Sequence, residues 1–195
     1  MDITGQHTTT NNGIIRGSHN TMSYLPPRHR WMRTFRAIAR CQSRTLFEQL
    51  DAGAEAIDLR VCFDIHGVAH FAHGLMTFQC PMSFEKVLDI LPSCTVVRLI
   101  LERKRRASDE RQLIRLCRAI ESAYPWLVFF GGYLKRSWRK LYRFKAEANG
   151  DLPLHQHVSS MATDARWYER IIPALYHMRK GHAEPLGGIN LYDFF

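Results

Sequence analysis

The sequence predicts an α/β fold in which a parallel sheet is covered by helices. Short β-like runs alternate along the chain with amphipathic helical segments, the order typical of such folds. Residues 96–101, Val-Val-Arg-Leu-Ile-Leu, are nearly all apolar, as expected for a strand that is covered on both faces. The predicted strands are Gly13–Ser18, Ala56–Phe63, Ala69–Ala72, Thr95–Glu102, Leu127–Phe130, His155–Ser159 and Ile189–Phe194.

The predicted helices follow from their caps and apolar stripes. Asp109–Tyr124 is preceded by Ser108, has acidic residues in its first turn and is followed by Pro125. The other predicted helices are Arg44–Ala52 with Ser43 as its cap, Phe84–Leu91 capped by Ser83, and Ala165–Lys180, which ends at Gly181. We expect Pro173 to kink the last of these.

Length and composition are those of one ordinary globular domain. The chain has 195 residues, of which 46% are hydrophobic and 23% charged, and no repeat or linker divides it. We expect residues 13–195 to form the domain and residues 1–12, which are polar and rich in Thr, to form a short tail. No run approaches the length of a membrane span and no signal peptide is seen, so we expect a cytoplasmic or peripheral membrane protein.

The cysteines indicate a reduced protein. They are odd in number, form no CxxC pair and lie mostly in apolar runs, so we interpret them as packing residues. They are Cys41, Cys62, Cys80, Cys94 and Cys117.

A net charge of +9 indicates an anionic partner, which could be nucleic acid, an anionic membrane surface or a substrate that carries phosphate. Basic residues are densest in Arg103–Arg106 and in Lys135–Arg143, where Trp138 and Tyr142 lie among them. The second segment could bind a headgroup or a membrane surface, but an exposed amphipathic helix explains it equally well. Charge alone does not choose among these partners, but no recognisable nucleic-acid motif is present, so nucleic acid is the least expected of the three.

Polar side chains enter the predicted strands in a consistent way. Alternation along Ala56–Phe63 places Asp58 and Arg60 on one face, where either a structural ion pair or a functional site explains them. In a barrel of parallel strands, catalytic groups lie at the carboxyl ends of the strands. The polar residues at or near strand ends, which we expect to share one site with this pair, are His19, Asn20, His73, Glu102 and Asp193.

Several segments resemble the X domain of phosphatidylinositol-specific phospholipase C. Residues 18–22, Ser-His-Asn-Thr-Met, resemble its opening motif, and residues 48–60 contain similar Glu-Gln-Leu, Ala-Gly and Asp-Leu-Arg segments. His73 and Gly74 match the second histidine and its glycine, 15 positions after Asp58. Residues 99–102 and 190–194 resemble a strand near the phosphate and the closing strand. The resemblance is strong over residues 13–102 and thin over residues 103–188.

The resemblance implies a phosphodiesterase on a compact, distorted (β/α)8 barrel of the TIM type, in one domain. Cleavage by the substrate's own neighbouring hydroxyl needs a base, an acid and a cation at the phosphoryl group. By analogy, His19 is the base, Asp193 supports its other ring nitrogen, His73 is the acid, and Arg60, beside Asp58, contacts the phosphoryl group. The implied substrate is a phospholipid of the phosphatidylinositol type or another phosphodiester, with Asn20 and Glu102 among its contacts.

The resemblance leaves metal dependence open. Calcium-dependent relatives hold the ion with an asparagine and three acids, and the matching residues here are Asn20, Asp58, Arg60 and Glu102. Because a guanidinium repels a neighbouring cation, we expect Arg60 to replace the ion and the protein to need no cofactor. The alternative is calcium or magnesium held by Asn20, Asp58 and Glu102.

Three other functions stay open from the sequence. A glycerophosphodiester- or sphingolipid-type phosphodiesterase on the same scaffold normally has a Glu-x-Asp metal pair where Asp58-Leu59-Arg60 stands here. A catalytically inactive relative that binds anionic headgroups keeps the same residues. A nucleic-acid-binding protein would instead show binding that weakens steeply with salt.

Overall fold

The computed structural model describes residues 13–133 and 153–195. The predicted tail, residues 1–12, and the basic aromatic segment Lys135–Arg143 lie outside the described residues.

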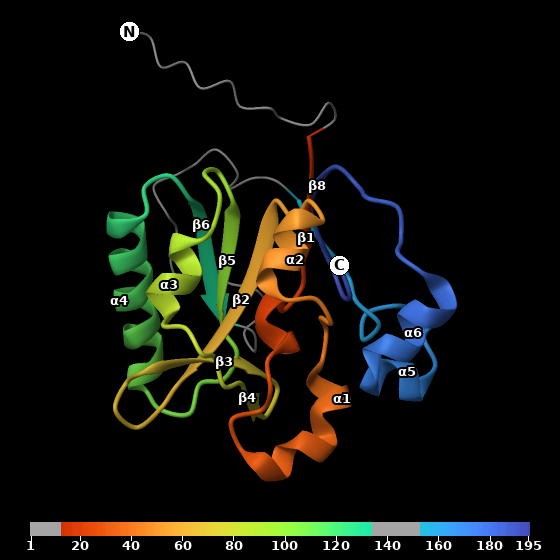
Figure 1. Cartoon of the computed structure of the whole chain (residues 1–195), viewed down its shortest axis with the longest axis horizontal. Helices are drawn as coiled ribbons and strands as arrows, with labels where there is room; N and C mark the ends of the chain where they lie inside the picture. The colour runs from red at the N-terminus through yellow and green to blue at the C-terminus, as the bar shows by residue number, and fades with distance from the viewer. Residues whose placement is uncertain (1–12, 134–152) are drawn as a thin grey trace, which may run out of the picture.

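A sheet of mainly parallel strands forms the centre of the molecule (Figure 1). Six strands pair in parallel in the order β6-β5-β2-β1-β8-β7. They are β1 (Ile14–Ser18), β2 (Ala56–Phe63), β5 (Val96–Leu101), β6 (Val128–Tyr133), β7 (Leu154–His157) and β8 (Gly188–Tyr192). The sequence-based prediction of an α/β fold with a parallel sheet is therefore confirmed.

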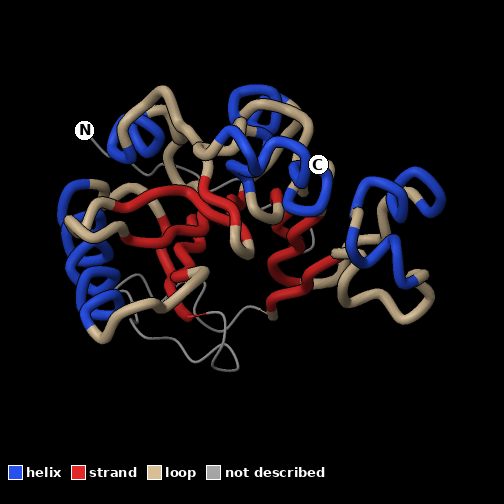
Figure 2. The backbone as a smooth tube through the Cα atoms, turned by 90° about the horizontal axis from the view of Figure 1, so that it is seen from below, coloured by secondary structure: helices blue, strands red, loops and turns tan. Residues whose placement is uncertain are grey.

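The sheet curls, as the view of Figure 2 shows, where the strands lie along an arc rather than in a flat row. Among the described residues β6 and β7 do not pair, so a complete (β/α)8 barrel is not shown. The curl brings together β5 and β7, which are not neighbours in the sheet. As a result, the Arg98 side chain of β5 reaches Gln156 of β7, with 3.4 Å between Nη1 and Oε1.

One predicted strand has the opposite direction. β3 (Ala69–His73) runs antiparallel to β2, with Phe71 opposite Val61. β4 (Met76–Thr77) follows and pairs antiparallel with β3. The expectation that His73 ends a strand of the parallel sheet is therefore wrong. The hairpin nevertheless brings His73 back along β2 toward Arg60, because an antiparallel partner returns along its neighbour.

Helices cover the outer face of β2 and β5 (Figure 1). They are α2 (Leu46–Asp51), α3 (Phe84–Asp89) and α4 (Ser108–Ala123). Thr45, rather than Ser43, caps α2, and it forms a capping box with Glu48. No helix in the described part of the chain is long and apolar enough to cross a bilayer.

The remaining helices follow β1 and β7 in the chain. Three short helices that the sequence did not predict follow β1, namely the 3-10 helices η1 (Thr21–Tyr24) and η2 (Arg30–Phe35) and the α-helix α1 (Arg36–Ala39). Pro173 divides the predicted helix Ala165–Lys180 into α5 (Trp167–Ile171) and α6 (Pro173–Lys180), because proline fits the first turn of a helix but not its interior.

The two faces of the central strands differ. Ile57, Leu59, Val61 and Phe63 of β2 point outward into the main hydrophobic core beneath α3 and α4, as alternation predicts. On the inner face, a small apolar cluster fills one end of the curl, and it contains Ala56, Val96, Ile189 and Leu191. The charged residues of β2 and β5 lie beyond this cluster, toward the carboxyl ends of the strands.

Candidate active site

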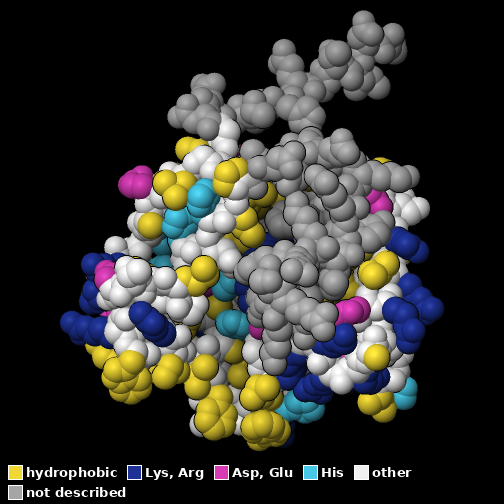
Figure 3. All heavy atoms as spheres, turned by 180° about the vertical axis from the view of Figure 1, so that it is seen from behind, with side chains coloured by type: hydrophobic (Ala, Val, Ile, Leu, Met, Phe, Trp, Pro, Cys, Tyr) yellow, Lys and Arg dark blue, Asp and Glu magenta, His cyan; other side chains and the backbone are white. Residues whose placement is uncertain are grey.

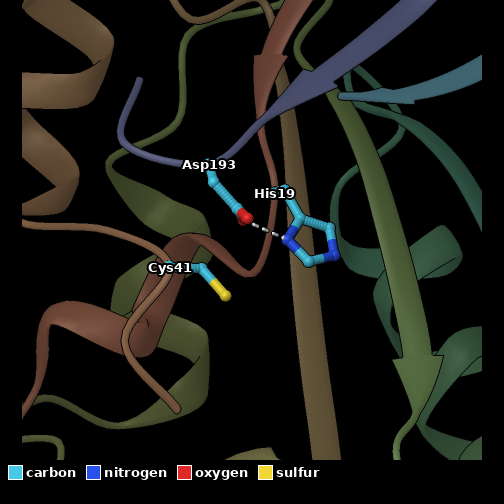
Figure 4. Close-up of side chains that lie close together, drawn as sticks. All are labelled: His19, Cys41 and Asp193. Carbon is cyan, nitrogen blue, oxygen red and sulfur yellow. Dashed lines mark hydrogen bonds and ion pairs between the residues drawn. The ribbon is translucent and has the colours of Figure 1, made fainter. Parts of the chain in front are cut away.

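The register between β1 and β8 places His19 beside Asp193. Ser18 is opposite Tyr192, so the residues that follow these two leave the sheet together. His19 Nδ1 lies 2.6 Å from Asp193 Oδ1, and both side chains are buried (Figure 4). Gln42 Nε2 donates to the backbone oxygens of His19 and Tyr192, each at 2.8 Å, which holds the two chain segments together.

Arg60 joins three site residues through separate nitrogens. Its Nε donates to Asp58 Oδ2 at 2.8 Å, its Nη1 donates to Glu102 Oε2 at 3.2 Å, and its Nη2 contacts His19 Nε2. Because a guanidinium only donates, this network assigns the proton of neutral His19 to Nδ1, facing Asp193, and the lone pair to Nε2. A lone pair at Nε2 is what a general base needs.

Asn20 takes part mainly through its backbone. Its φ of 47° is left-handed, a conformation that asparagine adopts more readily than most residues, and its N–H donates to Asp58 Oδ2 at 3.0 Å. Its side-chain Nδ2 is buried and has no hydrogen-bond partner among the described residues. Gly17, just before, lets β1 approach β2, since a Cβ there would lie 2.2 Å from the Ala56 oxygen.

His73 lies across from His19. The two ring centroids are 6.3 Å apart and the ring planes are nearly perpendicular, at 88°. His73 Nδ1 donates to the Ala39 oxygen at 2.9 Å, and Glu102 accepts from the N–H of the following Gly74 at 2.8 Å. These contacts hold one ring nitrogen of His73 and leave Nε2 for chemistry.

All seven predicted site residues thus lie in one group of contacts. Two further residues in it were not predicted. Arg98 is 1% exposed, and its Nη1 donates to Asp58 Oδ1 at 2.9 Å. The only sign of it in the sequence is a single charge within an otherwise apolar strand. Cys41 is also 1% exposed, with its Sγ 3.6 Å from His73 Nδ1, and no local pattern marks it.

Neighbouring charges determine the ionisation of the buried carboxyl and imidazole groups in the site. Burial opposes ionisation of Asp58, but Arg60 and then Arg98 outweigh it and hold the pKa of Asp58 well below its ordinary value. Burial likewise opposes ionisation of Asp193, yet His19 and His177 hold its pKa low. Burial and then the charge of Arg60 lower the pKa of His73. Asp58 and Asp193 are therefore ionised and His73 is neutral near pH 7.

The network faces a cavity of about 620 Å³. His19, His73 and Asp193 line one side, and the other walls are largely apolar side chains from η2, α1, β4 and α5, including Trp31, Phe35, Ile38, Met76 and Ile171. Figure 3 shows hydrophobic side chains gathered along the lower edge of the molecule, the edge at which η2 and α1 lie in Figure 1.

Comparison with solved structures found a match over nearly the whole chain. It is phosphatidylinositol-specific phospholipase C from Listeria monocytogenes, with a TM-score of 0.55, 17% sequence identity, and coverage of 97% of this chain and 92% of that chain. The chain has a phospholipase C-like fold. No protein-family model matches the sequence, and no curated protein matches it. The resemblance seen in the sequence is thus confirmed at the level of the fold.

Proposed function

We propose that this protein is a phosphoric diester hydrolase and lyase that cleaves a phospholipid-type phosphodiester, of the phosphatidylinositol kind, by attack of the substrate's own hydroxyl. The observation that carries the proposal is the placement of His19, Arg60 and His73 in one network beside one cavity. A base, a phosphate-binding cation and an acid are the three groups that this reaction needs.

In the first step, His19 Nε2 takes the proton of the attacking hydroxyl, whose oxygen forms a bond to phosphorus. The bond from phosphorus to the leaving oxygen breaks, and His73 Nε2 donates its proton to that oxygen, which leaves as an alcohol. Asp193 stabilises the charge that His19 gains, through the 2.6 Å contact with Nδ1. The product is a cyclic phosphodiester, which water opens in a second step with the two histidines in exchanged roles.

Arg60 has to change partners during this cycle. It contacts His19 Nε2 in the free protein, so a substrate phosphoryl group has to draw the guanidinium away before His19 can act as a base. The phosphoryl anion also supports protonation of His73, whose pKa is lowered by burial and by Arg60. Substrate binding therefore prepares both histidines.

We propose that no divalent ion takes part in the first step. The Arg60 guanidinium lies between the carboxylates of Asp58 and Glu102, at 2.8 and 3.2 Å, where a cation would otherwise be needed. Both oxygens of Asp58 already accept from arginines. Calcium or magnesium, with Asn20, Asp58 and Glu102 as ligands, is the alternative.

A phospholipid substrate agrees with the apolar rim of the cavity. Trp31, Phe35 and Leu75 line the cavity and are 67%, 53% and 77% exposed. Exposed apolar side chains that gather in one place mark a binding surface, and here basic residues such as Arg30 and Arg33 lie beside them. We propose that this rim contacts an anionic membrane surface peripherally while the substrate headgroup enters the cavity.

A panel of phosphodiesters tests the function. Phosphatidylinositol, a glycerophosphodiester, sphingomyelin and a substrate without a neighbouring hydroxyl are each incubated with the protein, and products are followed by phosphorus NMR. We expect a cyclic phosphate from phosphatidylinositol and no turnover of the substrate that lacks the hydroxyl. Headgroup binding without turnover would instead favour the inactive relative, and products without a cyclic phosphate would exclude internal attack.

A further inference from the structure

Two site residues, His19 and Asp193, form with Cys41 a set of three possible metal-ligand atoms, and the proposed reaction leaves the Cys41 thiol unused. His19 follows β1, Cys41 lies between α1 and α2, and Asp193 follows β8, so three distant parts of the chain supply them (Figure 4). One ligand atom from each side chain lies within 4.8 Å of the other two, and all three residues are buried. Such a gathering of sulfur, nitrogen and oxygen is a candidate metal site.

The donor set favours zinc over calcium or magnesium. Thiolate and imidazole are typical zinc ligands, whereas calcium takes six to eight oxygens. Zinc is bound tetrahedrally, and sites with three protein ligands keep the fourth position for solvent or another ligand. His19, Cys41 and Asp193 all line the cavity, so the fourth position is open to it.

A fourth side chain, that of His177, lies beside the same carboxylate. The His177 side chain is only 7% exposed, and its Nε2 lies 3.7 Å from Asp193 Oδ2, beyond hydrogen-bond distance. Within the described residues this nitrogen has no hydrogen-bond partner. A buried ring nitrogen beside a carboxylate is satisfied when the two share a cation, either a proton or a metal ion.

We propose that His19, Cys41 and Asp193 bind Zn²⁺ or a similar thiophilic divalent ion, and that the bound ion inhibits the enzyme. The ion takes the lone pair of His19 Nδ1, so the ring proton moves to Nε2, and the thiol proton of Cys41 is released to solvent. A protonated Nε2 cannot act as a base, and it also loses its contact with the Arg60 donor. The inhibition rests on the proposed function, whereas the binding does not.

Cobalt titration of the full, reduced chain tests the binding, because a cobalt–thiolate bond absorbs in the near ultraviolet. We expect one Co²⁺ per chain with this absorption, displaced by Zn²⁺. Cys41→Ser should lose the band and bind zinc at least about 100-fold more weakly, since even outer partners of a metal ligand change affinity 10–100-fold. Cys41→Ala serves in its place if the serine variant does not fold.

Cys62→Ser is the matched control, because Cys62 is also buried but its Sγ contacts Arg103 instead. It should keep the band. Absence of the band from the wild type, or its persistence without Cys41, would overturn the proposed site. Zinc should also inhibit phosphodiester cleavage reversibly, and equal inhibition of the Cys41 variants would overturn the inhibitory role. A protein that binds cobalt in this way but cleaves no phosphodiester would refute only the proposed function.

Discussion

The two faces of β2 and β5 differ in what they contact and in what they can do. The outward face, with Leu59 and Leu99, packs in the hydrophobic core beneath the helices. The inward face carries Asp58, Arg60 and Arg98, which are buried as completely but contact one another. Because side chains alternate along each strand, neighbouring residues have different roles: those that point outward stabilise the fold, and those that point inward form the site.

The inward face is the costlier arrangement. A buried charge has to be compensated by a partner, and removing one partner leaves the other uncompensated. Apolar contacts on the outward face are instead lost in proportion to the volume that is removed. Substitutions on either face should therefore lower stability, but only those on the inward face should also lower the activity of the folded protein.

Arg98→Met against Leu99→Ala is the sharpest test of this difference. Arg98→Met leaves Asp58 without one of its two cations, so we expect the free energy of unfolding to fall by about 3–5 kcal/mol and the folded fraction to lose activity. Leu99→Ala should cost about 2–5 kcal/mol and leave activity per folded molecule nearly unchanged. Denaturant unfolding and active-fraction assays measure both. Equal activity in the two folded variants would remove Arg98 from the site.

Arg60→Lys should have the next largest effect. The lysine keeps the charge but loses the fork that joins Asp58 and Glu102 and that we propose also binds the phosphoryl group, so we expect turnover to fall about tenfold or more. Wild-type turnover should persist in excess chelator. If chelator abolished it and calcium restored it, the metal-free proposal would be wrong and Asn20, Asp58 and Glu102 would be ion ligands.

The smallest expected difference is in acid unfolding, between the wild type and Asp193→Asn. The pKa of Asp193 is below its ordinary value in the folded state, so its contribution to stability is present above about pH 4 and is lost as the pH falls further. Between about pH 5 and pH 3, the wild type should lose about 1 kcal/mol more unfolding free energy than Asp193→Asn. Parallel curves for the two proteins would show that Asp193 carries no such coupling to His19.

Sequence patterns predicted the parts of this molecule that depend on local periodicity. The two faces of β2 follow from alternation, and the break at Pro173 follows from the chemistry of proline. The direction of β3 could not be predicted, because the side chains of a short strand show the same pattern in parallel and antiparallel pairing. Arg98 was overlooked, because a single charge in a covered strand has no partner nearby in sequence, and Asp58 is 40 positions away.

How the site residues come together was even harder to predict from the sequence. Their positions at or near strand ends indicated that His19 and Asp193, 174 positions apart, share one site, and only the resemblance to a known family indicated that the two side chains pair directly. Nothing local marks Gln42, which holds these two segments together, or Cys41, which enters the site from the loop before α2. Contacts of this kind depend on the register between β1 and β8, and that register is a property of the whole sheet.

We propose that His19 is the base and His73 the acid, and substrates that differ only in their leaving group separate these two roles. A matched pair of substrates has the same attacking hydroxyl and either an alkyl alcohol or nitrophenol as the leaving group. Because nitrophenol leaves without a proton, His73→Ala should lose about 100-fold or more in turnover on the alkyl substrate and little on the nitrophenyl substrate, whereas His19→Ala should lose about as much on both. Equal losses of folded His73→Ala on the two substrates would contradict the assignment of His73 as the acid.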